Sequence, residues 1–345
     1  MESTSTKNNT PVPYVIIAAV LAVGLWAFAP VFVTLIGDKA GAMEAMLVAS
    51  SSAIAASVVV ALVLWRKTVR LFHVPNRGTL LRGVGWAILS GVFLAFWYYG
   101  YYRALQNAPK VDVTVIAFTW PLISIIAIRL FSPSTAKGLT LPQWLLVLLS
   151  FVGAAVIAAS NLQAGGTEQV NLEILWAVAA ALGSGLYLPF AIKSLDSFNS
   201  LLDSPSASTF YSVSVVNMSA LAVALTMSVG IMGEALDFSR VDGSVLLIGA
   251  ILGVGTYLAA EVAWTWAIQA HKSLTISTLP YFTPAASVLL LSLLFGSPVK
   301  AVAIIGLVLI LASNLILHLW KPKQAPASVA ETIPAEIDKG PGNNV

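Results

Sequence analysis

The stretch EVAWTWAIQAHKSLTISTLPYFTP, which runs from Glu261 to Pro284, places a carboxylate, two tryptophans and two prolines inside an apolar hairpin. A related pattern occurs in the first half of the chain. ALQ at 104–106 and Pro121 correspond to AIQ at 267–269 and Pro284, at a constant offset of 163 residues. The sequence therefore predicts an internal repeat, with the 261–284 stretch and its counterpart at matching positions of the two halves.

Composition indicates that this fold is surrounded by lipid. The chain is 58% hydrophobic and only 10% charged, with a mean hydropathy of +0.88, which is typical of a membrane protein that crosses the bilayer many times. A helix needs about 20 apolar residues to cross the bilayer core. Ten such runs are present, at 13–36, 43–65, 80–105, 110–131, 141–161, 172–193, 206–232, 245–270, 273–295 and 298–320.

These runs predict an all-α membrane protein, because they are long and continuous and lack the short alternating segments of a membrane barrel. The backbone polar groups of each run must then be satisfied within its own helix. Ten helices in two related halves give five helices per repeat. Since five is odd, the second repeat must enter the membrane with the opposite orientation, so we expect two inverted five-helix repeats.

The same pattern predicts the division of the chain into segments. They are an N-terminal cytoplasmic cap at 1–12, a first repeat at 13–162, a linker at 163–171, a second repeat at 172–320 and a disordered cytoplasmic tail, rich in Pro and Ala, at 321–345.

Basic residues set the predicted orientation. The loop RKTVRLFHVPNRGTLLR at 66–82 carries five arginines and lysines, which places it on the cytoplasmic side of a cell inner or plasma membrane. Both termini are then cytoplasmic. The net charge of +3 comes largely from such inner loops, so a nucleic-acid partner is not expected. Arg103 and Arg129 lie near helix ends, where we expect them to extend toward water.

Proline interrupts four of the expected helices, at Pro30, Pro121, Pro189 and Pro284. A proline within a membrane helix removes one backbone hydrogen bond and permits a kink. These positions are therefore candidate gating hinges, with an ordinary packing bend as the alternative.

Two short motifs carry a family resemblance. FTWP at 118–121 and YFTP at 281–284 occupy the fourth helix of each half, and Trp264 lies in the helix before the second motif. Over residues 13–320 the chain resembles ten-helix, EamA-type transporters of the drug/metabolite transporter superfamily, and its motifs are most similar to those of the aromatic amino acid exporters. The resemblance implies a substrate cavity lined by the first, third and fourth helices of each half, with the fifth peripheral.

The expected eighth helix presents one polar and aromatic face. Its members recur at spacings of three and four residues, which places them on the same side of a helix: Tyr257, Glu261, Trp264, Thr265 and Ile268. The repeat maps Glu261, Trp264 and Thr265 onto Tyr98, Tyr101 and Tyr102. Trp120, Tyr281, Trp26 and Tyr187 complete the candidate substrate-binding set. Enrichment of Trp and Tyr at membrane interfaces is the alternative reading of these rings.

Glu261 is the most distinctive candidate, because a carboxylate at the centre of a bilayer costs about 2.5–3.5 kcal/mol. It should face protein or a wet cavity, where it could bind an amine or carry a coupling proton; a structural hydrogen bond is the alternative. The aromatic-exporter resemblance would lead us to expect a neutral side chain there.

Other classes of protein find little support. The chain has no cysteine, and His73, His271 and His318 are scattered without a catalytic or metal-binding motif, so we expect no enzyme, no metal and no cofactor. The expected function is secondary transport, with a small molecule and the lipid bilayer as the only partners. We expect export of aromatic or hydrophobic amino acids by alternating access, with proton coupling as an option. Import of a vitamin-like or other metabolite is the alternative. Two fused halves can enclose a site in one chain, which favours a monomer.

Overall fold

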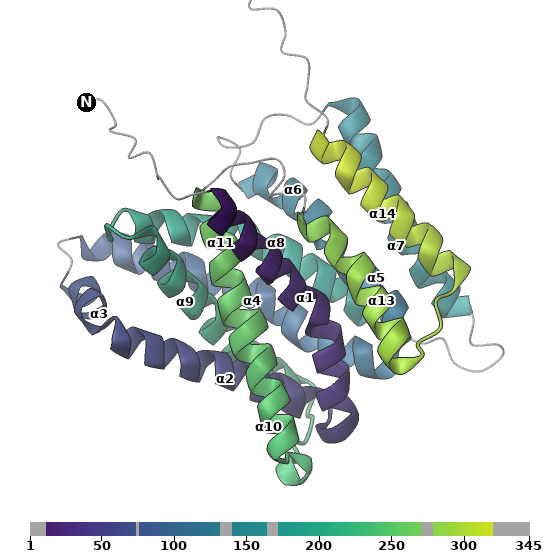
Figure 1. Ribbon diagram of the computed structural model, residues 1–345, viewed down its shortest axis with the longest axis horizontal. Helices are drawn as coiled ribbons and strands as arrows, with labels where there is room; N and C mark the ends of the chain where they lie inside the picture. The colour runs from purple at the N-terminus through teal and green to yellow at the C-terminus, as the bar shows by residue number, and fades with distance from the viewer. Residues whose placement is uncertain (1–11, 74–75, 132–139, 164–171, 271–278, 320–345) are drawn as a thin grey trace, which may run out of the picture.

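The computed structural model describes residues 12–73, 76–131, 140–163, 172–270 and 279–319, and Figure 1 shows that these parts form a bundle of helices. No β-strand occurs among them, as expected from the sequence. The helices are α1 (Val12–Ala40), α2 (Ala42–Val63), α3 (Trp65–Phe72), α4 (Arg77–Asn107), α5 (Lys110–Ala117), α6 (Trp120–Phe131), α7 (Leu141–Gln163), α8 (Ile174–Asn199), α9 (Pro205–Leu225), η1 (Thr226–Ile231), η2 (Phe238–Arg240), α10 (Gly243–Ala250), η3 (Ile251–Ala260), α11 (Glu261–Ala270), η4 (Leu279–Phe282), α13 (Thr283–Phe295) and α14 (Ala301–Leu319).

Within the described residues, seven helical segments are long and apolar enough to cross a membrane. They are Val12–Ala40, Ala42–Val63, Arg77–Asn107, Lys110–Phe131, Ile174–Asn199, Pro205–Ile231 and Gly243–Ile268. Three shorter apolar helices, Leu141–Gly153, Thr283–Phe295 and Ala301–Ser313, coincide with the other three expected spans. The chain is thus a multi-pass membrane protein, and the full count of ten spans stays a prediction. The expected ninth helix begins within 271–278, outside the described residues. Residues 1–11 of the expected cap and the whole expected tail at 321–345 also lie outside them.

Local chemistry defines where several helices begin and end. Gly41 separates α1 from α2 with a backbone φ of 97°, a conformation that favours glycine. The Asn76 side chain accepts a hydrogen bond from the Thr79 amide and caps α4, and the Asp242 carboxylate caps α10 through the Val245 amide at 2.9 Å. These caps satisfy amides that have no partner inside the helix.

The four prolines fall into two kinds. Pro30 and Pro189 lie inside α1 and α8, as expected for kink positions. Pro121, in contrast, lies in the first turn of α6, because the fourth expected span is broken at 118–119 into α5 and α6. Pro284 likewise lies in the first turn of α13, directly after the 3-10 turn η4. Proline is well suited to a first turn because no helical partner is lost there.

Two spans contain π-helical segments that the sequence did not predict. The first is η1 at the end of α9, and the second is the ten-residue η3, which joins α10 to α11 and ends directly before Glu261. π-helices are rare overall, but those that occur are often found at functional sites. Their wider turn changes which side chains of the helix face inward.

The helices of the two halves pack against each other. α1 contacts η3, α11 and α13, and in Figure 1 it lies between α11 and α13. α8 contacts α4 and α6, while α2 contacts α10 and η3, and α9 contacts α4. α7 and α14 run side by side at one edge of the bundle.

Small residues permit the closest of these contacts. A Cβ added at Gly253 of η3 would collide with the backbone of Ala49 in α2, and one at Gly91 of α4 would collide with Ser219 in α9. Membrane helices commonly use such residues to bring their backbones together.

The two ends of the bundle differ in chemistry. At one end, here called the α3 end, Lys67 of α3 donates to Ser204 before α9 at 3.2 Å. At the opposite end, here called the Arg103 end, Arg103 bridges Glu173 at 2.8 Å and Glu234 at 2.5 Å. Arg103, which we expected to extend toward water, is 24% exposed, and the two carboxylates hold its guanidinium over the ring of Trp176.

Two further ion pairs lie at the Arg103 end. Lys110 contacts Asp38 at 3.3 Å, and Lys300 contacts the buried Asp112 at 3.3 Å. The ion pairs of Arg103, Lys110 and Lys300 therefore all lie at this one end.

Candidate functional site

A cavity of about 630 Å³ lies in the centre of the bundle. Its size is within the range of about 300–1,000 Å³ that is usual for small-molecule sites. Side chains from α1, α4, the α5–α6 break, the first residue of α6, α8, η3, α11, η4 and α13 line it, and α9 adds Asn217. No described residue of α7 or α14 contributes to the wall. The first, third and fourth expected spans of each half thus surround the cavity.

The polar and aromatic face expected on the eighth helix lies in this wall. All five of its members line the cavity: Tyr257, Glu261, Trp264, Thr265 and Ile268. Tyr257 belongs to the end of η3 and the others to α11, so the π-helical segment leads directly into the part of the wall that carries Glu261.

Most of the other candidate residues also line the cavity: Trp26, Tyr98, Tyr101, Trp120 and Tyr187. Tyr102 does not line it. The side chain of Tyr102 is fully buried behind the wall, and its hydroxyl forms a hydrogen bond with the hydroxyl of Tyr257. The hydroxyl of Tyr102 is thus directed to the far side of the Tyr257 ring and not into the cavity. The side chain of Tyr281 lies outside the described residues.

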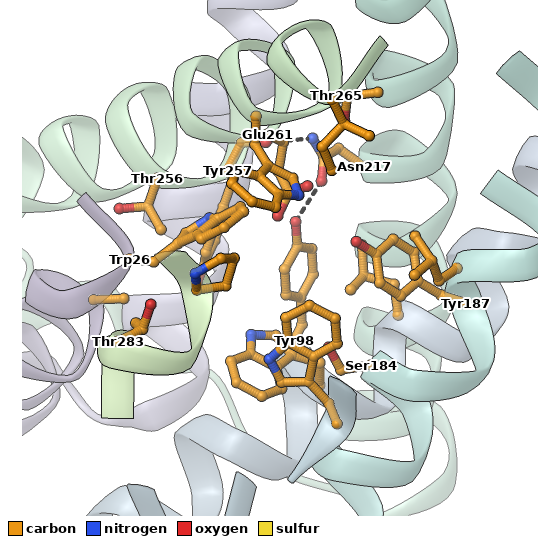
Figure 2. Close-up of a pocket in the computed structure, with 18 of the residues that line it drawn as sticks. Trp26, Tyr98, Ser184, Tyr187, Asn217, Thr256, Tyr257, Glu261, Thr265 and Thr283 are labelled. Carbon is orange, nitrogen blue, oxygen red and sulfur yellow. Dashed lines mark hydrogen bonds between the residues drawn. The ribbon is translucent and has the colours of Figure 1, made fainter. Parts of the chain in front are cut away.

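A chain of hydrogen bonds connects three helices at the wall, as Figure 2 shows. The Tyr98 hydroxyl donates to the side-chain oxygen of Asn217, and the Asn217 amide nitrogen donates to the backbone oxygen of Tyr257 at 2.7 Å. The rings of Tyr98 and Tyr257 stack at 4.7 Å between centroids. This network fixes α4, α9 and η3 relative to each other around the cavity, because each buried polar group has a partner.

Glu261 lies among aromatic side chains. Figure 2 shows it between Trp26 of α1 on one side and Tyr187 of α8 on the other. Trp26 lies beside its carboxylate (Figure 2). Trp26 also packs edge-to-face on Trp264, with 5.6 Å between ring centroids. No described lysine or arginine lies within 4 Å of Glu261, since the ion pairs are all at the Arg103 end.

The cavity opens at the α3 end. Asp196 and Asn199, near the end of α8, line the cavity and are exposed, as is Ile268 near the end of α11. Toward the Arg103 end, the lining side chains Tyr101 and Phe118 are buried, with relative exposures of 1% and 7%. The wall is therefore open on one side of the bundle and closed on the other.

The sequence missed several lining residues. Ser184 and Thr256 carry small hydroxyls that gave no distinctive signal, whereas Asn217 was a visible polar residue in an apolar run. Asp196 and Asn199 were missed because the sixth span was expected to end at 193, while α8 continues to Asn199. Among the described residues, no three His, Asp or Glu side chains group in the way that a metal ion would need.

Comparisons with known proteins agree with this geometry. Residues 13–159 match the model of the EamA-like transporter family. No curated protein matches the chain. A solved crystal structure is similar over 88% of this chain and 95% of its own, with a TM-score of 0.52 and 21% sequence identity, which concerns the fold alone.

The match covers the first half of the chain and is to a family of transporters. It does not distinguish the aromatic amino acid exporters from other transporters of this type.

Proposed function

We propose that this protein is a secondary transporter that moves small amphiphilic metabolites through the central cavity by alternating access. The observation that carries the proposal is that helices of both halves surround one cavity with a single carboxylate, Glu261, in its middle and aromatic rings around it. Inverted repeats that enclose a site between them are the usual architecture of such transporters.

Reciprocal packing supports the proposal of two inverted five-helix repeats. α1 contacts the eighth and ninth expected spans, and α8 contacts the third and fourth; α2 contacts the eighth, and α9 contacts the third. α7 and α14, the fifth span of each half, pair with each other. Exchange of the two halves leaves this pattern unchanged, as a twofold relation would require.

The proposed conformation is open to the cytoplasm. The α3 end carries the basic segment at 66–82, which favours a cytoplasmic location at an inner membrane, with both termini on the same side. The Arg103 end would then face outward, closed by the ion pairs of Arg103, Lys110 and Lys300. Opening outward would require these pairs to separate while the α3 end closes.

Glu261 is the proposed site of coupling as well as of binding. A carboxylate with no basic partner among the described residues can be neutralised by a proton or by the ammonium group of a substrate, and one group cannot hold both. Competition between proton and amine at Glu261 would couple export to an inward proton gradient. The proposed cargo is an amine with an apolar body, and aromatic and hydrophobic amino acids are the first compounds to test.

A second candidate is import of a vitamin-like metabolite, because the same cycle runs in either direction and the gradient decides. One chain surrounds the whole cavity with both of its halves, which supports a functional monomer.

The test is counterflow in proteoliposomes that contain the purified protein. Labelled phenylalanine, tryptophan and phenethylamine are offered to vesicles loaded with the same unlabelled compound, with and without a pH gradient. We expect exchange of at least one of them, and we expect Glu261→Gln to abolish gradient-driven accumulation. Absence of exchange for all three compounds in a correctly folded protein would contradict the proposal.

A further inference from the structure

We infer that the compound bound at Glu261 is a small monovalent organic cation with an aromatic or apolar body and no carboxylate. This inference rests on the proposed function and narrows its cargo to primary amines and quaternary ammonium compounds. Amino acids, which carry an acidic group as well as an amine, are then weak substrates.

The first argument is the charge of the cavity wall. Its described part contains two carboxylates, Glu261 in the middle and Asp196 at the mouth, and no lysine, arginine or histidine. Lys193 neighbours the wall residue Ile192 along α8, but its ammonium lies over the ring of Trp86 at 4.7 Å. A cleft with charge of one sign and apolar walls concentrates ions of the opposite sign.

The second argument concerns the groups that a substrate carboxylate would need. The Asn217 side chain already accepts from Tyr98 and donates to the Tyr257 carbonyl, and the Tyr257 hydroxyl is bonded to Tyr102. The Trp26 ring lies beside Glu261 (Figure 2). Several donors of the wall are thus engaged with each other, and those without a partner, the Tyr101 and Thr283 hydroxyls, are neutral. A buried substrate carboxylate would therefore lose its hydration without a basic partner.

The third argument is the shape and chemistry of the aromatic surround. Trp26 and Trp264 form an edge-to-face pair beside Glu261, and Tyr98 stacks on Tyr257 at the same level of the cavity. Aromatic faces attract cations, and groups of such rings are the usual means of recognising quaternary ammonium ligands. A carboxylate within an aromatic surround therefore suits a cation better than a zwitterion.

The experiment compares four compounds that share a phenyl ring and differ in charge. Labelled phenethylamine is bound to the purified full-length protein in lipid nanodiscs and displaced with unlabelled phenethylamine, phenyltrimethylammonium, phenylalanine or 3-phenylpropionate. We expect both cations to displace the label at concentrations about tenfold or more below that of phenylalanine, because an unpaired charge in a desolvated site costs at least this factor. The acid should not displace it.

Glu261→Gln keeps the size of the side chain and removes its charge, so phenethylamine should bind about tenfold more weakly and lose its advantage over phenylalanine. Asp203→Asn is the matched control, and since Asp203 is exposed and does not line the cavity it should keep that advantage. If phenylalanine displaces the label as well as phenethylamine does, or if Glu261→Gln keeps the preference, the inference is wrong. The wild-type ranking decides the matter even if the variant fails to fold.

Exchange of the same compounds in proteoliposomes separates this inference from the proposed function. Exchange of phenylalanine in preference to the amines would leave the transporter in place and overturn the inference. Cation-selective binding without exchange of any compound would support the inference and overturn the transport function. Absence of both binding and exchange would contradict both.

Discussion

The side chain of Trp264 has two neighbours with different consequences. It packs against the Trp26 ring, and it lies one helical turn from Glu261 on the face of α11 that lines the cavity. Trp264 also borders a small buried group formed by Val15, Ala19 and Ala267. Removal of this ring should therefore affect binding directly and stability to a smaller degree.

We expect Trp264→Ala to weaken binding of phenethylamine by about 0.5–2 kcal/mol, the usual worth of a cation-π contact. Binding is measured by displacement in nanodiscs, and thermal unfolding is measured on the same samples. Trp144→Ala is the control, because Trp144 is 40% exposed on α7 and does not line the cavity. A Trp264→Ala protein that loses stability but binds with wild-type affinity would show that the ring serves packing alone.

Single helices show which structural features a sequence can predict. Apolar length predicted the spans because lipid requires internally bonded helices, and a spacing of three and four residues predicted the wall formed by Tyr257, Glu261 and Ile268. The π-helical η3 left no signature, because π-helical turns depend on packing and not on residue type. The broken fourth span was marked by Pro121, but the sequence did not show that this proline begins a helix.

Gly24 and Gly183 illustrate the limit of a repeat as a guide to packing. Each lies six residues before the proline inside its helix, Pro30 in α1 and Pro189 in α8, yet their surroundings differ. A Cβ at Gly24 would meet no atom within 4 Å, whereas one at Gly183 would lie 2.5 Å from the Phe93 carbonyl oxygen of α4. Only tertiary contacts, which no single sequence displays, distinguish the two glycines.

Gly183→Ala should consequently destabilise the contact between α8 and α4. We expect a loss of about 1–3 kcal/mol, the usual cost of forcing an extra methyl group into a tight contact. Gly24→Ala is the matched control and should unfold like the wild type, as judged by thermal unfolding in detergent. Equal stabilities of the two variants would mean that α8 and α4 can separate at little cost.

For the whole molecule, the contrast between its two ends is the central feature. The cavity reaches exposed residues at the α3 end, while Arg103, Glu173 and Glu234 join three segments at the other. These side chains are about a quarter to a third exposed, so the ion pairs are partly screened by solvent. Such ion pairs can stabilise one conformation and still separate during transport, as an alternating-access cycle requires.

Accessibility of the cavity from each face of the membrane tests this account most directly. The chain has no cysteine, so Thr265→Cys places a single thiol in the cavity wall. A membrane-impermeant thiol reagent is applied to inside-out and right-side-out vesicles, with Arg103→Gln added to open the Arg103 end and Arg82→Gln as the charge-matched control at the α3 end. We expect labelling of the resting protein from the cytoplasmic face, and additional labelling from the outer face with Arg103→Gln but not with Arg82→Gln. Labelling from the outer face alone, or identical labelling with and without Arg103→Gln, would contradict a cavity that alternates between the two sides.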